Sequence, residues 1–350
     1  MREDGHSDVV RLAAGGLVLF LVVFALRELA PLLKPLCAAV FLFYLTVPVY
    51  DQLRVWKVPR PLAAAAPLFI GVGIVLPIGW ILAWQIGMLI ERLPAYWAKF
   101  GLLVEHVVAS IESALPAAHA PLSALMPETA ALMAAVRGLL STALWSLGDF
   151  VSLNILVFFY LVFIVIEAEG LPNRLKLAYG EEDSERILAV AGRVNQAIKR
   201  YFFVKITVSA LLSALSVATM LAFGLELPWF WAFLIFLCNF IPYLGSIVAG
   251  AFPIVLSFLQ FESASAAIGL SSLLILWQMV VGYYVEPLFT GRRLHLSPLV
   301  VMFTLALWGW LWGVVGLIVS VPLMVGVRYM LENIPETRKL AVLMGSDVEG

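Results

Sequence analysis

The chain has 350 residues, of which 63% are hydrophobic and only 13% are charged. A soluble protein carries about 25% charged residues, so this composition excludes a soluble fold. The formal net charge of −1 leaves no basic excess for binding nucleic acid. The apolar residues come in blocks long enough to cross a bilayer, which takes about 20 residues per helix. The sequence therefore predicts an all-α polytopic membrane protein.

Residues that hold metals or drive catalysis are few and scattered. The two cysteines, Cys37 and Cys238, lie inside apolar blocks, so they predict neither a disulfide framework nor a CxxC metal site. The four histidines show no HxxxH or HExxH spacing, and no GxxxxGK[S/T] phosphate loop occurs. We therefore expect no metal, no cofactor and no enzymatic activity.

The N-terminal half contains four apolar blocks. The first two cover about residues 9–30 and 32–50, and the start of the chain reads as a retained first helix because no small-residue cleavage site follows it. The third block, about residues 61–90, contains prolines and glycines that predict a kink or tilt. We expect residues 1–90 to form a scaffold of membrane spans and residues 150–166 to form the fourth span.

Two more polar stretches separate these blocks from the rest of the chain. Residues 91–149 contain an apolar stripe at helical spacing from Trp97 to Leu115, which predicts an extracytoplasmic amphipathic helical insert. Residues 167–202 are expected to form a basic helical loop that leads directly into the fifth apolar block, about residues 203–223.

The distribution of basic residues predicts the orientation in the membrane. Residues 167–205 contain seven Lys and Arg, whereas the longer stretch 91–149 contains three. Cytoplasmic loops collect Lys and Arg, so we place the first stretch inside and the second outside. Both termini, including the tail 332–350, are then cytoplasmic.

The C-terminal transport unit, residues 203–331, contains two segments of unusual length, residues 228–260 and 298–330. Each is too long for one span and too short for two spans with a turn. Their central prolines and glycines favour re-entrant hairpins, which would be the sixth and eighth of about eight membrane segments: Pro242, Gly245, Gly250 and Pro253 in the first, and Gly309, Gly313, Gly316 and Pro322 in the second. The alternative is two long, tilted and kinked helices.

Hairpins that enter from opposite sides form an inverted repeat, which is typical of secondary transporters. They would also keep Arg292 and Arg293 cytoplasmic, in agreement with the charge rule. Long tilted helices would instead require an exception to that rule. The hairpins are therefore the favoured interpretation.

Three runs within this unit are specific in combination: FIPYLGSIVAGAFP (240–253), YYVEPLFTGRRLHLSPLVV (283–301) and WGWLWGVVGLIVSVP (308–322). They resemble a known family of bacterial permeases, the autoinducer-2 exporter family. The resemblance covers most of the chain and implies a multi-pass transporter of the bacterial inner membrane that forms a homo-oligomer. Export of autoinducer-2, a small polar furanone, gives the family its name, and sodium/proton antiport is assigned to other members.

Unwound backbone inside a membrane exposes polar groups that a polar solute can satisfy. The expected breaks therefore supply candidates for substrate binding or hinge motion: Asn239, Pro242, Tyr243, Gly245, Ser246, Pro253, Gly313 and Gly316. Ordinary kinks satisfied by neighbouring helices are the alternative. On the fifth block, three residues on one face are expected to allow close helix packing: Ser209, Ser213 and Ser216.

A second group of candidates follows the seventh apolar block. Glu286, Arg292 and Arg293 are expected to serve in gating or ion coupling. An interfacial ion pair between Glu286 and one of the two arginines is the simpler interpretation.

The sequence predicts a secondary transporter or facilitator that exports a small polar organic solute such as autoinducer-2. Its expected partners are the lipid bilayer, the solute and further copies of the chain, with no nucleic acid. A sodium/proton antiporter is the alternative, disfavoured because no Asp or Glu lies in the centre of an apolar block, unless the hairpins draw Glu262 or Glu286 inward. A non-transporting membrane assembly or regulatory protein is the alternative from another class.

Overall fold

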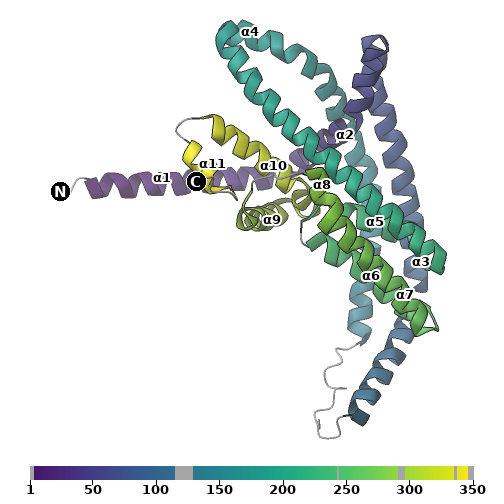
Figure 1. Cartoon of the computed structure of the whole chain (residues 1–350). Coiled ribbons are helices and arrows are strands. Elements are labelled where there is room, and N and C mark those ends of the chain that lie inside the picture. The colour runs from purple at the N-terminus through teal and green to yellow at the C-terminus, as the bar shows by residue number, and fades with distance from the viewer. Residues whose placement is uncertain (1–3, 115–128, 243, 291–295, 335–336, 346–350) are drawn as a thin grey trace. The chain divides into compact units, whose positions relative to one another are not determined.

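The computed structural model describes residues 4–114, 129–242, 244–290, 296–334 and 337–345. These residues are almost entirely helical, with one isolated antiparallel bridge between Leu296 and Gly345, which confirms the all-α prediction for them (Figure 1). The chain divides into two compact units. Unit 1 comprises Met1–Gly71, Asn154–Phe202 and Arg292–Gly350, and unit 2 comprises Val72–Leu153 and Phe203–Gly291.

Three helices form the N-terminal part. Helix α1 (Asp4–Glu28) and helix α2 (Ala30–Val55) meet in a bend at Leu29. Helix α3 (Arg60–Ala114) is a single helix of 55 residues, so the third apolar block and the beginning of the predicted insert are continuous. The side chains that would form most of the amphipathic face lie outside the described residues, and that face stays a prediction.

Helix α4 (Thr129–Phe223) joins the predicted fourth block, the basic loop and the fifth block. Its helical dihedrals are interrupted at Gly180, where φ is 80° and ψ is 176°, a backbone conformation that glycine adopts without a Cβ clash. The residues after Gly180 continue as helix to Phe223.

The first of the two long segments, residues 228–260, consists of α5 (Pro228–Cys238) and α6 (Leu244–Gln260). Its two ends meet: the Gln260 side chain donates to the Gly224 carbonyl oxygen at 2.7 Å and accepts from the Glu226 N–H at 2.7 Å. This helix pair, called the α5–α6 hairpin below, therefore returns to where it begins. It is followed by α7 (Ala264–Val280), a π-helical turn (Val281–Val285) and α8 (Glu286–Thr290).

The second long segment consists of α9 (Pro298–Trp312) and α10 (Val314–Asn333), followed by α11 (Arg338–Leu343). The turn lies at Gly313, whose φ of 66° and ψ of −140° favour glycine. Beyond the turn, a Cβ at Gly316 would collide with the Trp308 carbonyl group, so glycine permits the close return of the chain.

Both segments are thus helix–break–helix, but not every predicted breaker interrupts a helix. Gly250 and Pro253 lie inside α6, and Pro322 lies inside α10. A proline in a membrane helix loses one backbone hydrogen bond, and the freed carbonyl can be satisfied locally or by neighbours, so the helix need not end there. The breaks lie between Cys238 and Leu244 and at Gly313.

In unit 1, the tip of the α9–α10 hairpin contacts the bend between α1 and α2. The Trp312 indole N–H donates to the Leu26 carbonyl oxygen at 3.0 Å, and the Arg27 guanidinium lies 5.6 Å from the ring centre of Trp310. Leu26 is in the last turn of α1, where carbonyl groups lack partners within the helix. Trp312 therefore anchors the tip to the bend by satisfying one of them.

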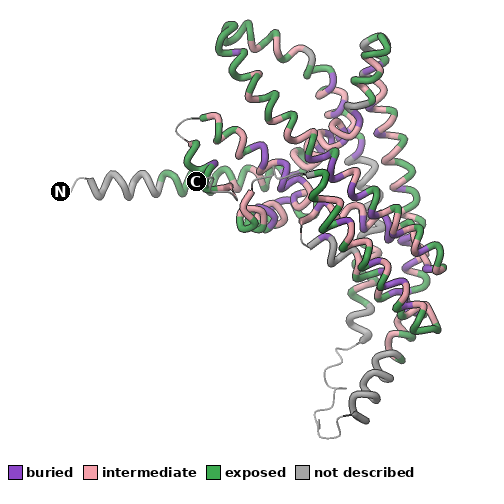
Figure 2. The backbone as a smooth tube through the Cα atoms, viewed as in Figure 1, coloured by how far each residue is buried: buried purple, intermediate pink, exposed green. Residues whose placement is uncertain are grey.

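Four described helical stretches are long and apolar enough to cross a membrane: Ala65–Leu102, Gly170–Phe223, Ala264–Phe289 and Val314–Asn333. A fifth results if the bent α1–α2 pair counts as one span. Large apolar side chains stay exposed along these helices, such as Trp80, which is 79% exposed, as expected for surfaces that face lipid (Figure 2). The larger number of eight segments stays a prediction.

Candidate functional site

Helix α5 is the short element around which the polar contacts of unit 2 gather. Its 11 residues extend roughly 16 Å, about half of the hydrocarbon thickness of a bilayer. It belongs to an apolar cluster to which α4 contributes Val208 and Leu212 and α7 contributes Leu270. Polar side chains from neighbouring helices bind α5 at its beginning, middle and end.

At its beginning, α5 is capped by a residue from α3. Leu227 occupies the N-cap position, and its side chain offers no hydrogen-bond acceptor. Pro228, at the first helical position, has no N–H group that would require one. The buried Gln85 side chain accepts a hydrogen bond from the Phe230 N–H at 2.6 Å. An N–H group of the first turn is thereby satisfied by α3 rather than by water.

In the middle and at the end, the serine face of α4 binds α5. The Ser213 hydroxyl donates to the Ala232 carbonyl oxygen. The Asn239 side-chain N–H donates to the Ser209 hydroxyl oxygen at 2.9 Å, at the point where α5 ends. The predicted packing face on the fifth block therefore also makes hydrogen bonds.

A buried ion pair lies at the same break. The Lys205 ammonium, on α4, donates to the Asn239 carbonyl oxygen at 3.2 Å and forms an ion pair with the Glu286 carboxylate. The side chain of Lys205 is 9% exposed and that of Glu286 27%. Glu286 directly follows the π-helical turn Val281–Val285, and such turns are frequent at functional sites. We call Lys205, Ser209, Asn239 and Glu286 the break site.

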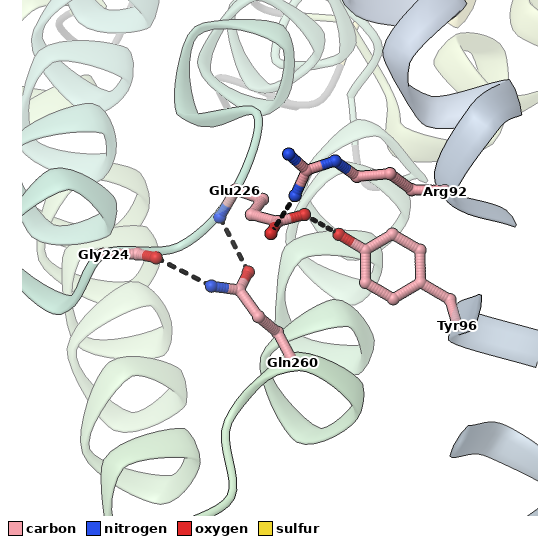
Figure 3. A network of polar contacts seen from close by, with 5 residues as sticks. All are labelled: Arg92, Tyr96, Gly224, Glu226 and Gln260. Carbon is pink, nitrogen blue, oxygen red and sulfur yellow. Dashed lines mark hydrogen bonds and ion pairs between the residues drawn. The ribbon is translucent and has the colours of Figure 1, made fainter. Parts of the chain in front are cut away.

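A second polar network lies at the beginning of the hairpin (Figure 3). Glu226, in the turn between α4 and α5, forms an ion pair with Arg92 and accepts a hydrogen bond from the Tyr96 hydroxyl. Gln260 binds the same turn from the end of α6. Since Gln85, Arg92 and Tyr96 recur at intervals of seven and four residues, they lie on one face of α3.

The structure places several sequence-predicted residues together and leaves others apart. Asn239 and Glu286 meet at Lys205, and a Cβ at Gly245 would collide with the Cys238 carbonyl group, so glycine permits the tight break beside Pro242. Pro253 lies inside α6, away from the break itself.

Other candidates belong elsewhere. Gly313 and Gly316 form the turn of the α9–α10 hairpin in unit 1. Tyr243, Arg292 and Arg293 lie outside the described residues, as does the side chain of Ser246. Among the residues that the structure describes, no group of three or more His, Cys, Asp and Glu could hold a metal ion.

Sequence reasoning missed two members of the break site and the helix cap. Lys205 was grouped with the cytoplasmic basic residues, and Ser209 was expected only to aid packing. Lys205 and the cap residue Gln85 each carried a signal in the sequence. Lys205 lies two residues inside an apolar block, and Gln85 is an amide within another. Placing a polar residue inside a membrane segment costs free energy, so specific partners are expected for such residues.

Comparison with known proteins gives relatives along most of the chain. It is 28% identical to a putative transport protein of Borreliella burgdorferi over 334 residues, 94% of this chain and 88% of the relative. It is 26% identical to the AI-2 transport protein TqsA of Escherichia coli K12 over 327 residues, 93% of each chain. A putative transport protein of Haemophilus influenzae is 34% identical over 217 residues, 61% of this chain and 62% of the relative. The profile of AI-2E family transporters matches residues 16–336, so the chain belongs to the AI-2E transporter family.

Proposed function

We propose that this protein is a secondary transporter or facilitator that exports a small polar organic solute across the bacterial inner membrane. The observation that carries the proposal is the break site, where Lys205 and Glu286 are paired beside the interrupted backbone at Asn239. Charged groups in membrane segments commonly mark substrate or ion pathways. Interrupted helices supply backbone groups to substrates in many transporters.

The chemistry of the break site favours a neutral or zwitterionic polar solute. It combines donors, the Lys205 ammonium and the Asn239 amide, with acceptors, the Glu286 carboxylate and the Ser209 hydroxyl. One positive and one negative charge leave no net excess to select a simple anion. A small polar compound such as AI-2, which the name of the Escherichia coli relative mentions, meets this requirement.

The mechanism that we infer is alternating access, in which the α5–α6 hairpin moves as part of residues 203–331. The meeting of its ends at Gln260, Gly224 and Glu226 supports a segment that enters and leaves the membrane on one side. The α9–α10 hairpin would enter from the opposite side, giving an inverted repeat. In this topology, residues 203–331 move against the N-terminal spans and both termini are cytoplasmic. We further infer that the protein forms a homo-oligomer, as the family resemblance implies.

Sodium/proton antiport is a second candidate function, and the position of Glu286 favours it. From the sequence, antiport is disfavoured because no Asp or Glu lies in the centre of an apolar block. In the structure, however, the partly exposed Glu286 carboxylate is paired with the buried Lys205 ammonium inside an apolar helical unit. Proton relays and coupled transporters use such groups.

Vesicle transport assays distinguish the two functions. Purified protein in proteoliposomes should move labelled AI-2, and Lys205→Met should lower the rate by about tenfold because a charged hydrogen-bond donor is lost. Ser209→Ala should reduce the rate less, and Ser141→Ala, outside both networks, should leave it unchanged. Proton-gradient-driven sodium flux without AI-2 flux would establish the antiporter instead. Transport of neither would refute both functions.

A further inference from the structure

The turn between α4 and α5 is held in an unfavourable backbone conformation. Gly224 has a φ of 72°, which glycine tolerates, but Leu227 has a φ of 58°. A branched side chain rarely adopts this left-handed conformation, and it persists where surrounding contacts determine it. Leu225 and Leu227 are buried, and they fix the turn from within the apolar core.

The polar contacts of this turn fall into two classes. Gln260 binds both Gly224 and Glu226, so it connects the beginning of the α5–α6 hairpin to its end and makes turn and hairpin one body. The Glu226 carboxylate instead bonds to Arg92 and Tyr96, which belong to α3 (Figure 3). The Glu226 carboxylate is therefore the group through which this turn bonds to α3.

We propose that Arg92, Tyr96 and Glu226 form a latch that fastens the α5–α6 hairpin to α3 and opens during transport. The proposal rests on the function proposed above. The side chains of Arg92 and Glu226 are 52% and 31% exposed, so water can replace their contact when it opens. In the Lys205–Glu286 pair the cation is 9% exposed, against 52% for Arg92, so water replaces that contact less readily.

The geometry also separates the two networks. The latch lies at the beginning of α5 and the break site at its end, roughly 16 Å apart along an 11-residue helix. Opening the latch releases the hairpin from one face of α3, and the strained backbone at Leu227 can then relax. Gln85, on the same face, caps α5 in the latched state.

Native Cys238 reports on this motion without any transport measurement. It lies in the last turn of α5 and packs against the apolar cluster of unit 2. In a Cys37→Ala background in proteoliposomes, Arg92→Gln or Glu226→Gln should raise the rate of Cys238 alkylation by N-ethylmaleimide about fivefold. Tyr96→Phe, which removes only a hydroxyl, should raise it about twofold. The Arg92→Gln/Glu226→Gln double variant should match the single variants, because either change alone opens the same contact.

Arg174→Gln is the matched control, since Arg174 forms an exposed ion pair with Glu167 in unit 1 and its loss should not affect Cys238. Suppose that alkylation is unchanged in the Arg92, Glu226 and Tyr96 variants while the parent protein still transports AI-2. This result would refute the latch proposal and leave the proposed function intact. Additive effects of Arg92→Gln and Glu226→Gln would overturn it as well. Absence of transport by the parent protein would instead refute the proposed function.

Discussion

Substitution of Glu286 should destabilise the protein far more than its partly exposed position suggests. In Glu286→Gln, the Lys205 ammonium keeps its charge, its side chain is 9% exposed, and the Asn239 carbonyl at 3.2 Å remains as a neutral acceptor. Leaving a buried charge unpaired costs about 3–5 kcal/mol when no other acceptor is available. The remaining carbonyl and the glutamine oxygen reduce this, so we expect a loss of about 2–3 kcal/mol in the free energy of unfolding.

Substitution of the other member of the pair, Lys205, should reduce the free energy of unfolding by less. In Lys205→Met, the carboxylate that loses its partner is 27% exposed and can bind water, so we expect a loss of about 1–2 kcal/mol. In the double variant, neither charge is left alone, and its stability should lie above that of Glu286→Gln alone. Replacing both members of a buried pair is often nearly neutral, whereas removing one is not.

The assay is unfolding of the purified protein in detergent micelles with increasing SDS, followed by tryptophan fluorescence. A double-mutant cycle over Lys205→Met and Glu286→Gln then gives the coupling energy of the pair. Arg174→Gln, at the exposed pair with Glu167, should show little change. Strictly additive effects at Lys205 and Glu286, or a greater loss for Lys205→Met than for Glu286→Gln, would refute the reasoning.

Three further predictions concern other parts of the chain. Gly313→Ala should destabilise by about 1–2 kcal/mol in the same assay because of its positive φ, whereas Gly73→Ala, in the open interior of α3, should be neutral or slightly stabilising. Gln85→Ala should cost about 1–2 kcal/mol by removing the cap of α5, and Gln85→Met, which keeps the length of the side chain but offers no oxygen acceptor, should cost a similar amount. In intact cells, an impermeant thiol reagent should label Arg137→Cys but not Arg174→Cys; the opposite pattern would reverse the predicted orientation.

The helix–break–helix form of the two long segments could be predicted because it follows from local rules. Segment length limits the number of spans, and glycine alone among the residues accepts the backbone of the turn at Gly313. Which of the candidate glycines and prolines interrupt a helix could not be predicted in the same way. Gly250, Pro253 and Pro322 are nominal helix breakers, yet helices continue through them because helix packing tolerates a single lost hydrogen bond.

Only two of the four residues of the break site, Asn239 and Glu286, could be predicted from the sequence. The physical reason differs from that for the helix breaks. Asn239 stands out as a polar residue at the expected break of residues 228–260, and Glu286 stands out as a carboxylate at the end of an apolar block. Lys205 is 81 residues from Glu286 and 34 from Asn239, and no local periodicity links positions so far apart. Counting Lys205 as a basic loop residue supported the predicted orientation and at the same time concealed its partner.

The polar contacts of α5 explain how a hairpin can be ordered and still move. Hydrogen bonds between membrane helices contribute only about 0.6–1.7 kcal/mol each, because alternative partners exist in the membrane. Gln85 and Ser213 therefore position α5 without locking it, and the exposed Arg92–Glu226 pair adds a contact that water can replace. The Lys205–Glu286 pair differs, since separating it without a substitute leaves charges in a largely buried place. A polar solute that supplies those substitute contacts would lower the barrier to movement at the break, and an empty site would resist it.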